Sequence, residues 1–136
     1  MNRPSAAELV ATARAARDRA YAPYSGFRVG AALLTAQGDV VTAANVENAS
    51  YGLAICAERS AVVAAVAAGS RRFLSIAVAG NGPDPVTPCG ACRQVLREFP
   101  EGVDLEVLCA CETGDELVTT TLGALLPDSF GPEALR

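Results

Sequence analysis

The sequence contains no histidine and no tryptophan, and only 5% of its 136 residues are aromatic. Histidine is the commonest general base in enzymes and the commonest metal ligand, so its absence excludes every Ser-His and Cys-His catalytic pair. Any metal chemistry in this chain must therefore use thiolates and carboxylates. With few aromatic rings, the core must be filled largely by Ala and Val, which favours close packing of helices on a sheet.

Long apolar runs are also missing. Charged or turn residues interrupt every apolar stretch before it reaches the roughly 20 residues that cross a bilayer. Arginines interrupt the first twenty residues, which lack the continuous apolar segment of a signal peptide. In a chain that is not exported, the five cysteines should be reduced. We therefore expect a cytoplasmic protein that has no membrane contact.

Features of nucleic-acid binding are scarce. The formal net charge is −4 at pH 7 and the arginines are scattered, whereas proteins that hold a phosphate backbone usually carry a basic patch. There is no glycine-rich phosphate loop of the GxxxxGK[ST] type either. The composition thus favours a small, weakly charged ligand and argues against nucleic acid as a partner.

The pattern of apolar residues and breakers predicts a single α/β domain, residues 1–136. Ser5 and Glu8 form a capping-box pattern that begins a helix reaching about residue 20. A turn at residues 37–39 joins the first two strands as an antiparallel hairpin, and later strand–helix–strand crossovers should have parallel strands. The result is a three-layer α/β/α arrangement with a mixed five-stranded sheet. The predicted strands cover 28–35, 40–46, 73–79, 105–111 and 117–120, the further helices 56–68, 89–99 and 121–126, and an irregular tail 130–136.

Two short motifs lie at the starts of predicted helices. Cys56 and Glu58 stand two residues apart, and Cys89 and Cys92 form a CxxC pair. Helix N-termini carry positive partial charge, which favours thiolate over thiol. Three thiolates with an open fourth position make a catalytic zinc site, and the nearby acid could carry protons for a water activated by the metal. Arg59, one helical turn after the first cysteine, could offset the thiolate charge, although its position also suits an ordinary surface arginine.

The residues leave three other interpretations of the cysteines open. A CxxC pair at a helix start is also typical of a redox dithiol, which leaves the pairing of Cys56 with a nearby acid unexplained. A structural zinc site could use the four sulfurs of Cys89, Cys92, Cys109 and Cys111. However, Cys109 and Cys111 lie two apart on an apolar strand and are most simply small core residues. Alternatively, no metal binds and all five cysteines are structural.

The chain closely resembles the small, homotetrameric, zinc-dependent cytidine deaminases, over about residues 20–130. Blasticidin-type deaminases share the zinc motif, but the Asn-Val-Glu-Asn sequence at 45–48 and the ending in Phe130 favour cytidine deaminase. Deaminases of guanine, deoxycytidylate or polynucleotide usually have histidine in place of the first cysteine, and this chain contains no histidine. The resemblance is carried by Cys56-Ala57-Glu58-Arg59, by Pro88-Cys89-Gly90-Ala91-Cys92-Arg93-Gln94 and by blocks at 24–32, 45–51 and 125–130.

This resemblance implies a hydrolase that converts cytidine and 2′-deoxycytidine to uridine and 2′-deoxyuridine with release of ammonia, in pyrimidine salvage. It implies one Zn²⁺ per subunit, held by Cys56, Cys89 and Cys92. Glu58 is implied to be the catalytic proton carrier, and backbone groups of Ala57 and Cys89 to read the base. The active sites are implied to be shared between subunits of a homotetramer.

The other matching blocks imply the substrate contacts. Phe27 matches a residue that packs on the pyrimidine. Asn45 and Glu47 match positions that hold the ribose, and residues two apart on a strand point to the same face. Phe130 matches an aromatic residue that reaches a neighbouring subunit's site. The predicted substrate-binding residues are Phe27, Asn45, Glu47, Tyr51, Ala57 and Phe130, and the predicted site-supporting residues are Arg59 and Gln94.

Overall fold

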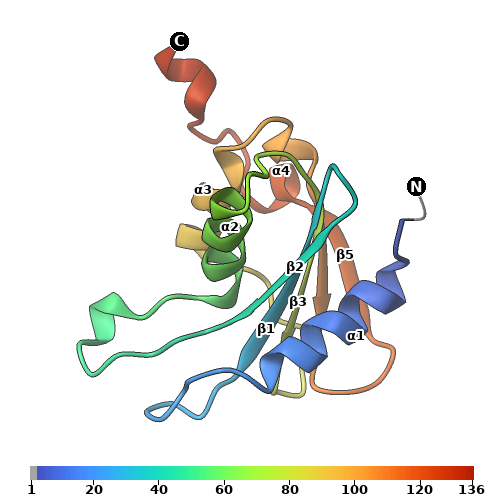
Figure 1. Ribbon diagram of the computed structural model, residues 1–136, viewed down its shortest axis with the longest axis vertical. Coiled ribbons are helices and arrows are strands. Elements are labelled where there is room, and N and C mark those ends of the chain that lie inside the picture. The colour runs from blue at the N-terminus through green and yellow to red at the C-terminus, as the bar shows by residue number, and fades with distance from the viewer. Residues whose placement is uncertain (1–2) are drawn as a thin grey trace.

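A five-stranded sheet in the order β2-β1-β3-β4-β5 forms the middle of the structure, a computed structural model that describes residues 3–136 (Figure 1). β1 pairs antiparallel with β2 and with β3, β3 pairs parallel with β4, and β4 pairs antiparallel with β5. The predicted mixed sheet and antiparallel first hairpin are therefore confirmed. The strands are β1 (Val29–Thr35), β2 (Val40–Ala44), β3 (Phe73–Gly80), β4 (Glu106–Ala110) and β5 (Leu117–Thr121).

Helices cover both faces of this sheet (Figure 1). One buried cluster packs α1 residues such as Leu9 against Ala32 and Leu34, while a second packs α2 residues such as Val62 against Leu33. Successive β1 side chains thus enter opposite layers, as strand geometry requires. The predicted three-layer arrangement is confirmed. The α-helices are α1 (Ala6–Arg17), α2 (Ala57–Ala67), α3 (Gly90–Arg97) and α4 (Leu122–Leu125), and the 3₁₀ turns are η1 (Tyr51–Leu53), η2 (Gly102–Asp104) and η3 (Pro132–Leu135).

The first helix begins as predicted and ends early. Ser5 Oγ accepts from the Glu8 amide at 3.1 Å and the Glu8 carboxylate accepts from the Ser5 amide at 3.0 Å, which confirms the capping box. The helix stops at Arg17 instead of near residue 20, because Tyr21 pairs with the chain after β2: its amide donates to the Asn45 carbonyl at 3.0 Å.

Other boundaries also shift for local reasons. β2 ends at Ala44 because Val46 forms separate bridges to Tyr21 and Ile55. The loop between β2 and α2 extends away from the sheet and turns at η1 (Figure 1). The tail, predicted to be irregular, contains the short η3 turn, so that prediction was wrong there; we call residues 127–136 the C-terminal segment. No helix in the described part of the chain is long and apolar enough to cross a membrane.

At Gly30, β1 and α1 come into direct backbone contact. A Cβ on Gly30 would lie 2.5 Å from the Arg17 amide nitrogen and 2.9 Å from the Arg17 Cα. Because these are backbone atoms of a helix, no rotamer change could relieve the overlap. Only glycine lets α1 rest this closely on the sheet.

We expect Gly30→Ala to lower the free energy of unfolding by about 1–3 kcal/mol, because α1 must move off the sheet. Chemical denaturation and Tm, at one protein concentration, would measure the loss. Gly52→Ala is the matched control, since a Cβ there meets nothing within 4 Å and should change stability by less than about 0.5 kcal/mol. Equal stability of the two variants would contradict the close approach.

Candidate active site

Three cysteine sulfurs meet where the N-termini of α2 and α3 lie side by side. Cys56 and Cys89 are the N-cap residues of these helices, and Cys92 lies in the first turn of α3. The three Sγ atoms lie within 4.8 Å of one another, and those of Cys56 and Cys89 are 3.7 Å apart. Sulfurs bound tetrahedrally to zinc at about 2.3 Å stand about 3.8 Å apart, so the thiol geometry fits a zinc ion.

The helix starts favour thiolates at these positions. Neither the Cys56 nor the Cys89 side chain accepts a capping hydrogen bond from the backbone of its own helix. The first amides and the positive end of each helix therefore lie beside the sulfurs. The rival four-sulfur arrangement is not seen, because Cys109 and Cys111 are buried and do not join the cluster. Cys109 packs in the core between the sheet and α2, as a small apolar residue would.

The charges around the sulfurs are unevenly distributed. Hydrogen bonding from Cys92 lowers the pKa of Cys56 to about 5, and the Arg59 guanidinium, with Nη2 3.6 Å from the Cys56 sulfur, contributes further. The same hydrogen bond, together with burial, raises the pKa of Cys92. Between these two sulfurs, the protein alone thus favours the thiolate at Cys56. A bound dication is the chemical partner that would make all three sulfurs thiolates.

Glu58 is the acid beside these sulfurs. It lies in the first turn of α2 and is only 4% exposed. Burial raises the pKa of its carboxyl group, and the neighbouring Cys56 thiolate raises it further. A carboxyl group with a raised pKa in a cavity is suited to take up a proton and return it.

A cavity of about 190 Å³ opens beside the thiols and gathers several of the predicted site residues. Its walls come from the β1 entrance, the chain after β2, the start of α2 and the segment between β3 and α3. Val86 and Thr87, which sequence reasoning missed, form one side. The lining residues are Phe27, Val29, Asn45, Cys56, Ala57, Glu58, Val86, Thr87 and Cys89.

Asn45 and Phe27 are joined in one wall of this cavity. The Asn45 side chain accepts from the Val29 amide at 2.8 Å and donates to the Phe27 carbonyl at 2.9 Å. The Phe27 ring lies against the chain at Gly80, where an added Cβ would come within 3.0 Å of Phe27 Cζ. The side-chain amide of Asn45 therefore fixes the segment that carries the Phe27 ring. These two bonds use its oxygen and one N–H, so its second N–H is not used by them.

Glu47 lies outside the thiol cavity. It lines a second hollow of about 310 Å³ with Ser25 and Tyr51, whereas Asn45 lines the thiol cavity. The Glu47 carboxylate accepts from the Tyr24 amide at 2.9 Å, from the Ser25 amide at 3.2 Å and from the Ser25 hydroxyl. These bonds, the hydroxyl bond above all, lower the pKa of Glu47.

Ser25 connects the two hollows, and sequence reasoning missed it. Its hydroxyl donates to Glu47 and accepts from the Phe27 amide at 2.9 Å. The only sequence signal was its place in the block at 24–32. Across the second hollow the ring centroids of Tyr24 and Tyr51 are 5.7 Å apart.

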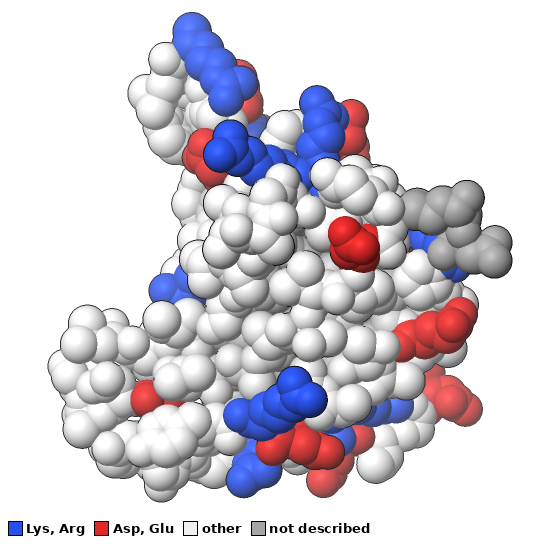
Figure 2. Space-filling model, viewed as in Figure 1, with Lys and Arg blue, Asp and Glu red and all other residues white. Residues whose placement is uncertain are grey.

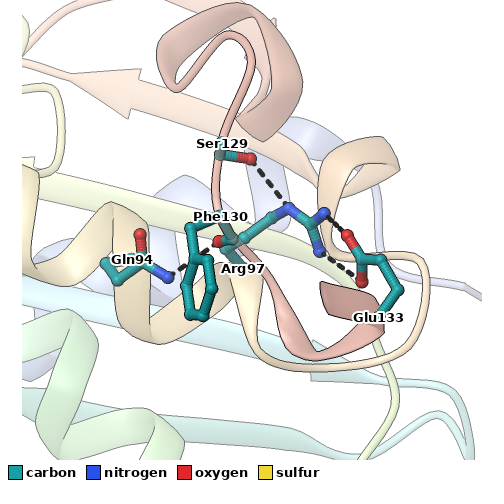
Figure 3. Close-up of polar contacts among 5 residues, drawn as sticks. All are labelled: Gln94, Arg97, Ser129, Phe130 and Glu133. Carbon is teal, nitrogen blue, oxygen red and sulfur yellow. Dashed lines mark hydrogen bonds and ion pairs between the residues drawn. The ribbon is translucent and has the colours of Figure 1, made fainter. Parts of the chain in front are cut away.

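Phe130 and Gln94 lie away from the thiol cavity. The Gln94 side chain donates to the Phe130 carbonyl at 3.0 Å, so it contacts the C-terminal segment and not the sulfurs (Figure 3). The Phe130 ring is 61% exposed and lines no described cavity of its own chain near the thiols.

The surface carries no feature of a polyanion site on the face that Figure 2 shows. Basic and acidic side chains are scattered there among uncharged ones, without a continuous basic patch. This distribution agrees with the net charge of −4.

Comparison with known proteins assigns the family. Residues 4–106 match the family model described as the cytidine and deoxycytidylate deaminase zinc-binding region. A cytidine deaminase of Halalkalibacterium halodurans is 47% identical over 94% of this chain and 96% of that protein, and one of Sporosarcina psychrophila is 44% identical over 94% and 93%. The chain therefore belongs to the zinc-binding cytidine and deoxycytidylate deaminase family.

Solved structures agree with this assignment. The crystal structure of cytidine deaminase from Burkholderia pseudomallei has a TM-score of 0.88 and 51% identity, covering 93% of this chain and 100% of that one. The structure from Mycobacterium tuberculosis has a TM-score of 0.79 and 44% identity, covering 90% and 94%. The resemblance seen in the sequence motifs is thereby confirmed, together with the fold class and the zinc cofactor.

Cysteine variants should separate the metal ligands from the core cysteine. We expect Cys56→Ala to lose bound zinc, because two thiolates of one helix hold the ion less tightly than three. Cys109→Ala should keep a full zinc content, since burial raises the pKa of the Cys109 thiol to about 11 and the side chain lies in the core. Metal analysis and a free-thiol count would measure both. Zinc retained in Cys56→Ala but lost in Cys109→Ala would contradict the assignment.

Proposed function

We propose that this protein is a hydrolase that converts cytidine and 2′-deoxycytidine to uridine and 2′-deoxyuridine, releasing ammonia, in pyrimidine salvage. The observation that carries this proposal is that a buried acid, Glu58, lines the same small cavity as Cys56 and Cys89, two members of a three-thiol cluster that fits zinc. The family assignment makes nucleoside amines the expected substrates. A chain without histidine has few other groups for this proton transfer.

Glu58 would carry both protons of the reaction. Zn²⁺ held by Cys56, Cys89 and Cys92 would, when bound, supply Lewis-acid activation of a water molecule. The Glu58 carboxylate would take one proton from a water molecule as the oxygen of that water bonds to C4 of cytosine, and would give this proton to N3. Glu58 would then take the remaining proton from the new C4 hydroxyl and deliver it to the amino nitrogen. The C4–N bond breaks, and ammonia leaves as the C4 carbonyl forms.

Arg59 would balance the charge of the thiolates. Three thiolates around a dication leave a net charge near −1, which weakens the activation of water. The Arg59 guanidinium lies 3.6 Å from the Cys56 sulfur and can draw electron density from it. We therefore assign Arg59 a supporting role at the metal.

The two hollows would divide the nucleoside between them. Phe27 would pack on the pyrimidine in the thiol cavity, where the backbone of Ala57 lies beside the base position. Asn45 and Glu47 would hold the ribose, with the ionised Glu47 accepting from the 3′-hydroxyl. A carboxylate there disfavours a 5′-phosphate by charge repulsion, so a nucleoside is preferred to a nucleotide. Tyr51 would close the ribose side.

Self-association would complete these sites. The loop between β2 and α2 and the C-terminal segment both project from the body and carry exposed apolar side chains, among them Tyr51, Leu53 and Phe130 (Figure 1). Between α2 and α3, exposed Val63 borders a largely apolar groove of about 640 Å³. Apolar surfaces of this extent mark interaction sites. We propose a cytoplasmic homotetramer of single-domain subunits, without nucleic-acid or membrane partners, in which Phe130 enters a neighbouring subunit's site.

The catalytic proposal is tested by cytidine turnover, followed by the change in ultraviolet absorbance. The zinc-loaded protein should be active, lose activity on zinc removal and regain it on zinc addition. We expect Glu58→Gln to keep zinc and the fold while kcat falls by about 10²–10⁴, the usual contribution of a general acid–base group. Glu116→Gln, a change at an exposed glutamate, is the matched control and should be fully active. Near-normal turnover in Glu58→Gln would exclude the proton-carrier role.

Site sharing is tested by Phe130→Ala, which should raise KM for cytidine about tenfold, as expected for the loss of one aromatic contact with a nucleoside. Leu135→Ala removes another exposed apolar side chain of the same segment and should leave KM unchanged. Co-expressing Phe130→Ala subunits with Glu58→Gln subunits should restore a fraction of sites with normal KM, because each kind supplies what the other lacks. Unchanged kinetics in Phe130→Ala, or no recovery on mixing, would count against sharing.

A further inference from the structure

The C-terminal segment is clamped to one side of α3 (Figure 3). Gln94 donates to the Phe130 carbonyl at 3.0 Å, and Arg97 Nε donates to the Ser129 hydroxyl at 2.8 Å. The two terminal nitrogens of Arg97 also pair with the two carboxylate oxygens of Glu133, with Nη1 3.4 Å from Oε2. Gln94 and Arg97 are three residues apart and so lie on the same helical face.

The Arg97 guanidinium is closely packed and largely buried. Its side chain is 11% exposed, although its partner Glu133 is an exposed residue. Beneath it lies Gly131, which is buried, and a Cβ on Gly131 would stand 2.5 Å from Arg97 Cζ. The guanidinium plane therefore occupies the space that any side chain at position 131 would need. This fit distinguishes the contact from an ordinary surface ion pair, which contributes little.

We call the contacts of Gln94 and Arg97 with the C-terminal segment the clamp. The clamp holds the residues on both sides of Phe130 but leaves the Phe130 ring exposed. The residues on either side, Ser129 and Gly131, both contact Arg97, and the Phe130 carbonyl is bound by Gln94, yet the ring is 61% exposed. A segment held at the Phe130 carbonyl, and bonded or packed against Arg97 at both neighbouring residues, presents the Phe130 side chain in one direction. Such ordering before binding spares the entropy loss that a mobile aromatic would suffer on every encounter.

The same helix also carries two of the three thiols. From Cys89, at the N-cap of α3, to Arg97, in its last turn, the axial distance is about 12 Å at 1.5 Å per residue. One rigid element thus links the thiol cluster at its start to the clamp at its end.

We propose that Arg97 is a positioning residue that, with Gln94, Gly131 and Glu133, fixes the direction in which Phe130 is presented to a neighbouring subunit. This inference rests on the proposed role of Phe130 in a shared site. If Arg97 were only structural, its loss would change stability without acting through Phe130.

The clamp itself can be observed without any enzyme assay. Because the chain has no tryptophan, Phe130→Trp places one tryptophan in each subunit of the assembled, zinc-loaded protein, and this reporter can be excited apart from the three tyrosines. We expect Arg97→Ala to lower the fluorescence anisotropy of this reporter and to increase its quenching by acrylamide. Gly131→Ala should do the same without removing a charge, because its methyl group displaces the guanidinium. Glu133→Gln, a change at an exposed position, is a milder third variant if either of the others fails to fold.

The effect on catalysis is measured separately, in variants that keep the native Phe130. We expect kcat/KM for cytidine to fall roughly tenfold in Arg97→Ala, since a displacement of about 1 Å in a binding group can cost up to about a hundredfold. Zinc content should not change. In the Phe130→Ala background, Arg97→Ala should add no further loss, the non-additivity expected of residues that act through one another. Arg3→Ala, which breaks the exposed ion pair with Glu106 at 3.7 Å, is the control and should leave both readouts unchanged.

Each alternative outcome is decisive. Unchanged reporter mobility in Arg97→Ala and Gly131→Ala would overturn the clamp. Greater mobility with unaltered kcat/KM, or a further loss in the Phe130→Ala background, would overturn the positioning role. If Phe130→Ala alone leaves the kinetics unchanged, the shared site is what fails, and the reporter still decides separately whether Arg97 orders the segment.

Discussion

The rest of this structure depends on placing two helix N-termini side by side. Cys56 and Cys89 begin α2 and α3, so the positive ends of both helices face one small volume in which three sulfurs meet. Without histidine, a metal site here must concentrate negative charge, and that charge needs compensation from the helix ends and from Arg59. The sheet order places these two helices on the same face, opposite α1. The layered fold therefore serves mainly to hold the two helix starts together.

The neighbourhood of the sulfurs moves the pKa values of adjacent groups in opposite directions. Hydrogen bonding and Arg59 lower the pKa of Cys56, while burial raises that of Glu58 two residues later. The two pKa values shift in opposite directions because the Cys56 sulfur lies beside Arg59 and the start of the helix, whereas the Glu58 carboxyl group is buried in the protein. A ligand sulfur that holds charge and an acid that readily accepts a proton are the two functions that hydrolytic deamination requires. In the proposed mechanism, metal binding and proton transfer are thus divided between two groups within a single helical turn.

Local patterns predicted the sheet, the hairpin, the capping box and the thiol cluster, because turn residues and helix starts are encoded in adjacent positions. They did not predict the early end of α1, or that Asn45 and Glu47 line different hollows. The early end of α1 follows from the bridge between Tyr21 and Val46, residues that no periodicity connects. The hydrogen bond from Ser25 to Glu47 and the packing of Arg97 on Gly131 also depend on contacts between distant segments. Features that depend on contacts between segments distant in the sequence could not be predicted from local patterns.

The spacing of the sulfurs has a consequence for folding as well as for chemistry. Cys56 and Cys89 are 33 positions apart in the chain, so an ion that binds both cross-links the protein as a disulfide would. In the loop-closure model, a cross-link across a loop of this size removes about 3–4 kcal/mol of entropy from the unfolded ensemble. Since metal affinity becomes folding free energy when the unfolded chain cannot bind the ion, the catalytic metal also tethers the two helices. Loss of the ion would therefore loosen the region that the active site is built from.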